Sequence, residues 1–187
     1  SGYHAKGDGA FGSNIFEWDS TSTETDNGGT IIKLTSIATG RYKLKYSGAV
    51  NVKWFGAKGN DIDDELSLFN AFEYTNSALN KHIYIPSGIY RTNGMDWTNY
   101  SGMRIEGASK SSTIIKAKNG WTGFTNMNGD KCFILTNIFY GGDYTENYSS
   151  YTAPQFLNIN NIQIRDVSTS EQVENTVGLY WGRTHRS

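Results

Sequence analysis

The sequence predicts a mostly β protein with one α-helix, and three observations carry this prediction. Short runs of alternating apolar and polar residues recur along the 187 residues, separated by glycine, asparagine and serine. Glycine is abundant, with 21 residues, whereas proline is scarce, with two. A period near 3.6 residues is convincing in only one segment, at about 64–78. We therefore expect many short strands joined by tight turns, together with a single helix.

Composition argues against several classes of function. The formal net charge of −1 provides no phosphate-neutralising surface, so we expect no nucleic-acid partner. No apolar run has membrane-spanning length, so we expect no membrane partner. Cys132 is the single cysteine and lies in an apolar run, where a buried, inert thiol is expected. No motif has the spacing of a metal site, and we expect no cofactor.

Residues 1–48 are expected to form a small antiparallel β module. Residues 14–18 alternate as a half-buried strand does, and residues 30–34 and 41–46 supply two further strands. Glycine turns separate these strands, as in Asp26-Asn27-Gly28-Gly29. Three short strands are marginally stable alone, so we expect this module to pack on the next unit or on another chain.

The second unit, 49–187, begins with an apolar segment at 50–55, which we expect to be a strand. A glycine turn at 56–59 follows, and then a cluster of acids made up of Asp61, Asp63, Asp64 and Glu65. The helix comes next, at about 64–78. Asp63 or Asp64 is a natural N-cap for it, because a carboxylate can accept hydrogen bonds from the free amides of the first turn.

The helix carries an apolar stripe that we expect to be buried. Leu66, Phe69 and Phe72 recur at three-residue steps, and Leu68 and Ala71 widen the stripe. A strand at 82–85 follows the helix and stops at the turn Pro86-Ser87-Gly88. The remaining chain reads as a series of short strands, which we expect at 89–92, 103–106, 113–116, 133–135, 156–159, 162–165 and 177–180. Their spacing is irregular, so no fixed repeat length supports the assignment.

The acidic cluster allows two interpretations. Two carboxylates can act as acid and base in glycoside hydrolysis when their environments separate their pKa values. The favoured interpretation is structural, because capping a helix requires acidic residues at these positions. The three histidines, His4, His82 and His185, lie far apart in the sequence with no evident partner, so they predict no nucleophile–base pair. We therefore predict no catalytic residue.

A polar loop at 139–151 is a candidate carbohydrate-binding surface. Its candidate residues are Tyr140, Asp143, Tyr144 and Tyr148. Aromatic rings can cover the apolar side of a sugar while carboxylates bind its hydroxyl groups. The alternative, which we favour, is that these tyrosines pack the loop against its own coil or against a neighbouring subunit. Trp121 and Trp181 have the same two interpretations.

The order of elements in residues 49–90 resembles the entry segment of the pectin-lyase-like proteins, which fold as right-handed parallel β-helices. The shared features are the strand, the glycine turn 56–59, the acids before one helix, the strand 82–85 and its Pro-Ser-Gly turn. Residues 7–33 also resemble the module that precedes the β-helix in many bacteriophage tailspikes. The resemblance implies a neck-like β module at 1–48, a helix that caps the open first coil, and then the first coils of a β-helix.

The resemblance also implies a function for the longer protein. Tailspikes are homotrimers on the virion tail that bind other tail proteins, recognise bacterial capsule, O-antigen or exopolysaccharide after reaching the host, and often depolymerise it. We expect the chain, which starts at Ser1-Gly2, to be cut from a longer protein at both ends, and to be inactive alone. Two alternatives stay open: a fragment of a secreted bacterial polysaccharide lyase or hydrolase, and a non-enzymatic module for receptor binding or virion assembly.

Overall fold

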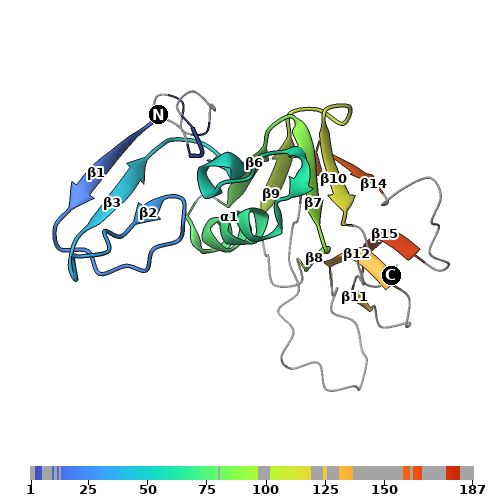
Figure 1. Ribbon diagram of the computed structural model, residues 1–187. Coiled ribbons are helices and arrows are strands. Elements are labelled where there is room, and N and C mark those ends of the chain that lie inside the picture. Colours follow the sequence, from blue (N-terminus) through green and yellow to red (C-terminus); the bar gives the residue numbers. More distant parts are fainter. Residues whose placement is uncertain are drawn as a thin grey trace, which may run out of the picture.

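The computed structural model describes residues 3–5, 10, 12, 14–79, 81–96, 102–118, 124–125, 131–136, 158–160, 162–165 and 176–181. A small antiparallel sheet lies at one end, and three sheets of mainly parallel pairing form the rest (Figure 1). One α-helix lies between these two parts. In the described part of the chain no helix is long and apolar enough to cross a membrane.

The N-terminal sheet contains three antiparallel strands, as the sequence predicts. They are β1 (Ile15–Asp19), β2 (Ile31–Ile32) and β3 (Arg41–Lys45), in the order β1-β3-β2. Trp18 pairs with Tyr42 across the sheet, and their ring centroids are 5.0 Å apart. Arg41 is buried and donates hydrogen bonds to the carbonyl oxygens of Glu24, Ala38 and Gly40, so its guanidinium group ties the loops of the module to its central strand.

The remaining strands form successive coils of a parallel β-helix. The first coil contains β4 (Val50–Asn51) and β5 (Asn60–Asp63), and the second contains β6 (His82–Ile85), β7 (Gly88–Thr92) and β8 (Met95–Asp96). The third coil contains β9 (Arg104–Gly107), β10 (Thr113–Ala117) and β12 (Lys131–Thr136). The fourth coil contains β13 (Asn158–Asn160), β14 (Gln163–Arg165) and β15 (Thr176–Trp181). Equivalent strands stack into the sheets β4-β6-β9-β13, β5-β7-β10-β14 and β8-β12-β15. A short strand, β11 (Phe124–Thr125), pairs with β12 antiparallel. This arrangement confirms the predicted fold class.

Register within one sheet shows how the coils stack. Val50, Ile83, Ile105 and Ile159 lie side by side at one position of four successive strands. Val50, Ile83 and Ile105 are fully buried. The stacked side chains of Val50, Ile83 and Ile105 fill the interior, and their neighbours along these strands point outwards because side chains alternate in a strand.

The segment expected as a strand at 50–55 is only partly a strand. After β4, residues Val52–Phe55 form a 3₁₀ helix, η1. The Asn51 side chain accepts a hydrogen bond from the Lys53 amide at 2.9 Å, and Gly56 closes the turn with a φ of 94°. The apolar run indicated a strand, but this N-cap and the left-handed glycine favour a helical turn. Val52, Trp54 and Phe55 are buried nonetheless.

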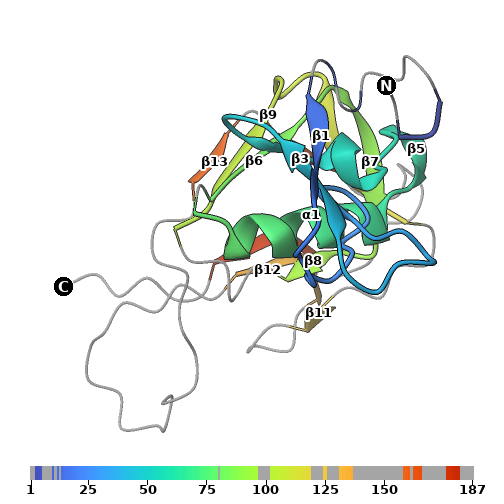
Figure 2. The ribbon, with the colours of Figure 1, turned by 90° about the vertical axis from the view of Figure 1, so that its left-hand side faces the viewer.

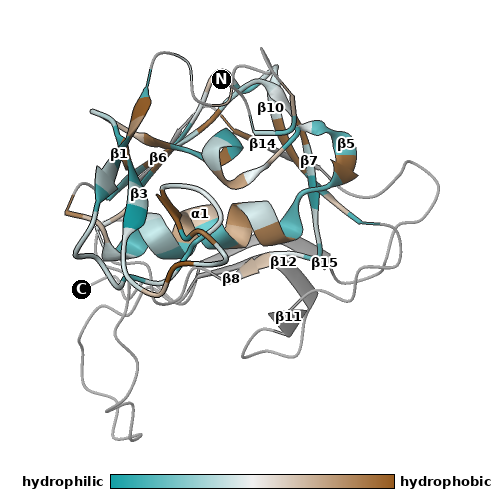
Figure 3. Cartoon of the chain, turned by 60° about the vertical axis from the view of Figure 1, so that its left-hand side comes forward, coloured by the Kyte–Doolittle hydropathy of each residue, from teal (hydrophilic) through white to brown (hydrophobic). Residues whose placement is uncertain are grey.

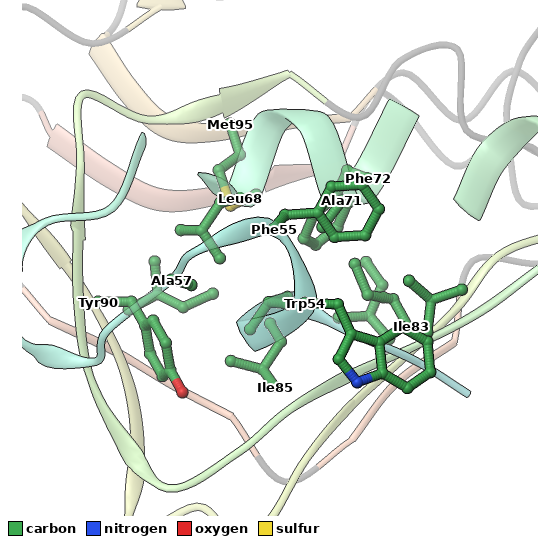
Figure 4. Close-up of a cluster of buried hydrophobic side chains, with 14 of the residues drawn as sticks. Trp54, Phe55, Ala57, Leu68, Ala71, Phe72, Ile83, Ile85, Tyr90 and Met95 are labelled. Carbon is green, nitrogen blue, oxygen red and sulfur yellow. The ribbon is translucent and has the colours of Figure 1, made fainter. Parts of the chain in front are cut away.

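The helix α1 (Glu65–Ser77) follows β5, at the place where the later coils have their third strand. It packs on η1, β4, β6 and β7. Figure 2 shows β6 and β9 on one side of the molecule and β7 on the other, with α1 crossing the end of the coils. Leu68, Ala71 and Phe72 enter the core beside Phe55 and Ile83 (Figure 4). The helix therefore caps the interior, as the sequence predicts.

The buried face of α1 differs from the predicted stripe. Leu66 and Phe69 are exposed, at 71% and 55%, whereas Leu68, Ala71, Phe72 and Thr75 are buried. Apolar residues occur almost all around this helix, so the three-residue spacing wrongly placed Leu66 and Phe69 on the buried face. Polar and apolar bands alternate along α1 in Figure 3. Tyr90 of β7 is fully buried, and its hydroxyl donates to the Pro86 carbonyl at 2.9 Å.

An aromatic cluster joins the N-terminal module to the cap. Tyr46 follows β3, and its ring lies 4.7 Å from Trp54 of η1, centroid to centroid. Its hydroxyl lies 3.0 Å from that of Tyr74 on α1. Phe55 packs against Tyr74 at 5.7 Å and against Gly29 of the module. Burial between these rings raises the pKa of Tyr46, and the Tyr74 hydroxyl adds to that effect.

Candidate functional site

The outer face of the sheet β4-β6-β9-β13 carries a group of polar side chains. His82 and Tyr84 of β6 flank the buried Ile83, and Arg104 and Glu106 of β9 flank the buried Ile105. The register places His82 beside Arg104 and Tyr84 beside Glu106. We call these four residues the outer strip.

The carboxylate of Glu106 contacts both His82 and Arg104 of the outer strip. Its Oε2 lies 2.9 Å from Nε2 of His82 and 3.0 Å from Nη2 of Arg104. The side chain of Glu106 is 28% exposed, that of His82 22% and that of Arg104 52%. A partner for His82 is not evident in the sequence, because Glu106 lies 24 residues away and only the stacking of coils brings the two together.

Asp64 precedes the first helical residue, as expected of an N-cap, but its carboxylate does not bond to the helix. Its two oxygens accept hydrogen bonds from the backbone amides of Lys58, at 2.7 Å, and Gly59, at 2.9 Å. Asp64 is buried, and this desolvation raises the pKa of its carboxyl group although the two amides oppose the rise. Asp64 therefore occupies the N-cap position, but its side chain holds the glycine turn against the start of α1.

Asp63 makes the hydrogen bond to the helix instead. Its Oδ1 accepts from the amide of Glu65 at 3.0 Å, and Oδ2 lies 2.6 Å from Nζ of Lys118. Partial burial raises the pKa of Asp63, but the bonds from Lys118 and from the Glu65 amide outweigh it, so the pKa lies below its usual value. Lys118 Nζ also lies 2.5 Å from the Glu65 carboxylate.

Asp61 lies in a bulge of β5 and has a φ of 65°, a left-handed conformation rare outside glycine. Arg91 of β7 donates from Nε to its Oδ1 at 2.7 Å and to its carbonyl oxygen at 3.0 Å. The Arg91 bond holds the pKa of Asp61 below its usual range, and Lys116 at 3.6 Å adds to the effect. The contact with Arg91 therefore both lowers the pKa of the Asp61 carboxyl group and holds the left-handed backbone of this residue in place.

These contacts bear on the chemistry of the acidic cluster. Glycoside hydrolysis requires one carboxyl group with a raised pKa and a second, ionised one facing the same substrate. Asp64 has the raised pKa, but both of its oxygens are occupied by amides, and the residue is only 3% exposed. Asp61, Asp63 and Glu65 are all paired with cations. The contacts of these acids connect β5 and α1 to the neighbouring coils, so the role of the cluster is structural.

The predicted carbohydrate-binding residues, Tyr140, Asp143, Tyr144 and Tyr148, lie outside the described residues, as does Trp121. Cys132 lies in β12, in accord with its apolar run, but its side chain is not among those described. Within the described ranges, histidine, cysteine and acidic side chains form no group of three that could hold a metal ion.

A pocket of about 240 Å³ lies between η1, the glycine turn that follows it and the N-terminal residues Tyr3, His4 and Ala10. Tyr3, His4, Lys53 and Lys58 contribute to its lining. Nε2 of His4 lies 2.7 Å from the carbonyl oxygen of Gly56, so the N-terminal segment is bonded to the turn. The pocket lining includes amines, an imidazole and a phenol but no carboxylate among the described residues, so it does not supply the two carboxyl groups used in glycoside hydrolysis.

Comparison with known proteins agrees with the coil architecture. Residues 49–182 match the model of the family described as rhamnogalacturonase A/epimerase, pectate lyase-like. Among curated proteins, alginate lyase 7 of Azotobacter vinelandii is 31% identical over 144 residues, and mannuronan C5-epimerase AlgE1 of the same organism is 35% identical over 79 residues. These matches cover 63% and 38% of this chain, but only 17% and 6% of the two relatives.

Solved structures with a similar arrangement include two phage proteins. One is the tailspike protein gp49 of Acinetobacter baumannii bacteriophage Fri1, titled a capsular polysaccharide depolymerase, with a TM-score of 0.45, 15% identity and coverage of 89% of this chain and 32% of that one. The other is the enzymatically active domain of tailspike protein 2 from bacteriophage CBA120, with a TM-score of 0.36, 17% identity and coverage of 81% and 26%. The family match spans most of the chain and starts where β4 begins the coils: the chain belongs to the rhamnogalacturonase A/epimerase, pectate lyase-like family.

Proposed function

We propose that this chain is the N-terminal part of a phage tailspike that recognises and depolymerises a bacterial surface polysaccharide. In this proposal the 187 residues supply the closed end of the β-helix and a scaffold for assembly on the virion tail. The observation that carries it is the family match over 49–182, joined to a cap that seals the first coil. The β1-β3-β2 module packed on that cap supports the phage assignment through the resemblance of its sequence to tailspike neck modules.

The substrate class rests on the curated relatives. They are named for alginate and mannuronan, which are polymers of uronic acids. The chain spans less than a fifth of alginate lyase 7, so the activity proposed is that of the longer protein. We place catalysis outside the described acids, since Asp61, Asp63, Asp64 and Glu65 are engaged in structural contacts.

Two assays on the full-length protein test this activity and separate its possible reactions. In a lyase, a base removes the proton from C5 of a uronate, the C4–O bond breaks, the leaving oxygen takes a proton, and a C4=C5 double bond forms. Ultraviolet absorbance detects that product, whereas a hydrolase adds water across the glycosidic bond and releases only a new reducing end. We expect cleavage of at least one capsular, O-antigen or exopolysaccharide by the full-length protein and none by these 187 residues alone. Turnover by the pure 187-residue chain would contradict the structural role proposed for its acids.

A second candidate function is that of a secreted bacterial polysaccharide lyase, and the 31% identity to alginate lyase 7 favours it. Oligomeric state separates the two candidates. We propose a homotrimer for the tailspike, because closed symmetry covers exposed apolar surface such as Leu66 and Phe69 without an open-ended contact. Light scattering of the full-length protein is expected to give a trimer, and a monodisperse monomer would favour the secreted lyase.

A further inference from the structure

The outer strip has the geometry of a surface that follows an extended polymer. Adjacent coils lie about 4.8 Å apart, so side chains at equivalent positions repeat along the stack at roughly the length of one sugar ring. His82 and Tyr84 come from the second coil, and Arg104 and Glu106 from the third. The backbone register continues to Asn158 and Asn160 of the fourth coil. The strip thus crosses the strands in the direction in which the β-helix extends.

Arg104 is the most accessible cation of this face. Its side chain is 52% exposed, and one of its terminal nitrogens contacts Glu106 at 3.0 Å. A guanidinium group has five N–H donors in a planar fork, so Arg104 retains donors for a second carboxylate. Glu106, two residues along the same strand, contacts Arg104 through Oε2, and this oxygen also lies 2.9 Å from Nε2 of His82.

The cations on the neighbouring sheet are less exposed than Arg104. On the outer face of β5-β7-β10 the side chains of Arg91, Lys116 and Lys118 are only 19%, 23% and 22% exposed. Each lies within 3.6 Å of an aspartate. These three cations are already paired with Asp61, Asp63 and Glu65, so they have little attraction left for an anionic ligand. In the outer strip, by contrast, the side chain of Arg104 is 52% exposed and contacts the single acid Glu106.

We propose that the outer strip binds the uronate-bearing backbone of an acidic polysaccharide. Arg104 binds a sugar carboxylate through its free N–H groups. The half-buried ring of Tyr84, in register with Glu106, packs against the apolar face of an adjacent sugar. Glu106 contacts one terminal nitrogen of Arg104, so it competes with the sugar carboxylate for this guanidinium group. This inference rests on the proposed function for its ligand class, and it concerns binding outside any catalytic centre.

Affinity electrophoresis of the 187-residue chain tests the proposal, with alginate in one gel and the neutral polymer dextran in another. We expect alginate, but not dextran, to retard the chain. Arg104→Ala should weaken the alginate affinity by about three- to tenfold, the range for one charge-assisted contact on a partly exposed surface. The matched control is Lys45→Ala. It removes the same charge from an ion pair with Glu17 in the N-terminal module, and should leave the specific affinity unchanged.

A second pair of variants tests a substitution that should raise, rather than lower, the affinity for alginate. Glu106→Gln releases Arg104 from its ion pair and should increase alginate affinity, whereas Glu17→Gln, with the same change in net charge, should not. Circular dichroism of each variant checks that the fold is retained. Equal shifts for the outer-strip variants and their controls would overturn the proposal in favour of non-specific charge attraction. Absence of retardation of the wild-type chain would also overturn it.

Failure of this inference is distinguishable from failure of the proposed function. If the full-length protein cleaves a polysaccharide and Arg104→Ala leaves alginate binding unchanged, only the outer strip is refuted. If the strip variants behave as expected and the full-length protein cleaves nothing, only the depolymerase activity is refuted.

Discussion

The ring of Phe55 lies directly over the backbone of Gly29: a β-carbon at position 29 would stand 2.5 Å from Cδ1 of that ring. Phe55 belongs to the 3₁₀ helix of the cap, and Gly29 to the N-terminal module. The module and the β-helix therefore meet through a contact in which no side chain other than hydrogen fits. Phe55 is itself buried and packs on Tyr74 of α1, so it cannot move aside freely.

Gly29→Ala is expected to lower the free energy of unfolding by about 3 kcal/mol, because overpacking forces either the ring or the backbone to shift. Gly48→Ala is the control. Position 48 has open space but a φ of 80°, so the control should cost only about 1 kcal/mol. Urea unfolding of both variants measures the difference, and equal losses would show that the contact with Phe55 is not tight.

Phe72 and Phe69 provide a comparison within one helix. Phe72 is fully buried in the cap and Phe69 is 55% exposed, so Phe72→Ala should cost about 3–5 kcal/mol and Phe69→Ala less than about 1 kcal/mol. Thermal melts followed by circular dichroism are suited to the measurement. A larger loss from Phe69→Ala would mean that α1 is rotated about its axis relative to the structure.

Asp64→Ala should destabilise the chain by about 2 kcal/mol, because the amides of Lys58 and Gly59 lose their charged acceptor. The pKa of Asp64 is raised above 3.8, so its folded form binds a proton more tightly than the unfolded chain does. The protonation of Asp64 therefore contributes stability as the pH falls through its folded-state pKa, the opposite of the usual behaviour of an aspartate. Nuclear magnetic resonance titration of the carboxyl carbon can verify the direction of the shift.

Asp61 should show the usual behaviour. Arg91 lowers its folded-state pKa below 3.8, so the stabilising contribution is complete above that pH and is lost as the pH falls through the folded-state value. Asp61→Asn retains a residue that tolerates the left-handed backbone and removes the charge. We expect the variant to melt below the wild-type chain at pH 7, with the gap closing towards pH 2. A gap that is independent of pH would attribute the effect to packing.

Local patterns in the sequence were sufficient for most of the fold. The strands of the second coil are marked by alternation around Pro86 and Gly88, and the helix is the one segment with a clear 3.6-residue period. Two features misled the prediction. Val52–Phe55 carries a strand-like apolar run, yet the Asn51 cap makes it helical, and apolar residues on several sides of α1 hid which of them are buried.

The outer strip could not be predicted in the same way. His82 and Glu106 are 24 residues apart, and the loop lengths between coils vary, so their contact depends on a register that no local pattern specifies. The sequence pattern places Asp61 in the acidic capping cluster, because the residue that determines its role, Arg91, lies 30 residues further along the chain. Sequence periodicity thus identifies individual elements, while side-chain partners on neighbouring coils follow only from the stacked structure.

The position of α1 has a consequence for synthesis. Residues of the cap leave the ribosome before those of the later coils, and N-terminal segments fold first during translation. The cap and the strands β4 and β5 therefore provide a finished template on which β6, β7 and the coils after them can assemble one at a time. Each new coil then pairs with the exposed strands of the coil before it. A nascent chain therefore leaves only its most recent coil free to pair with another nascent chain.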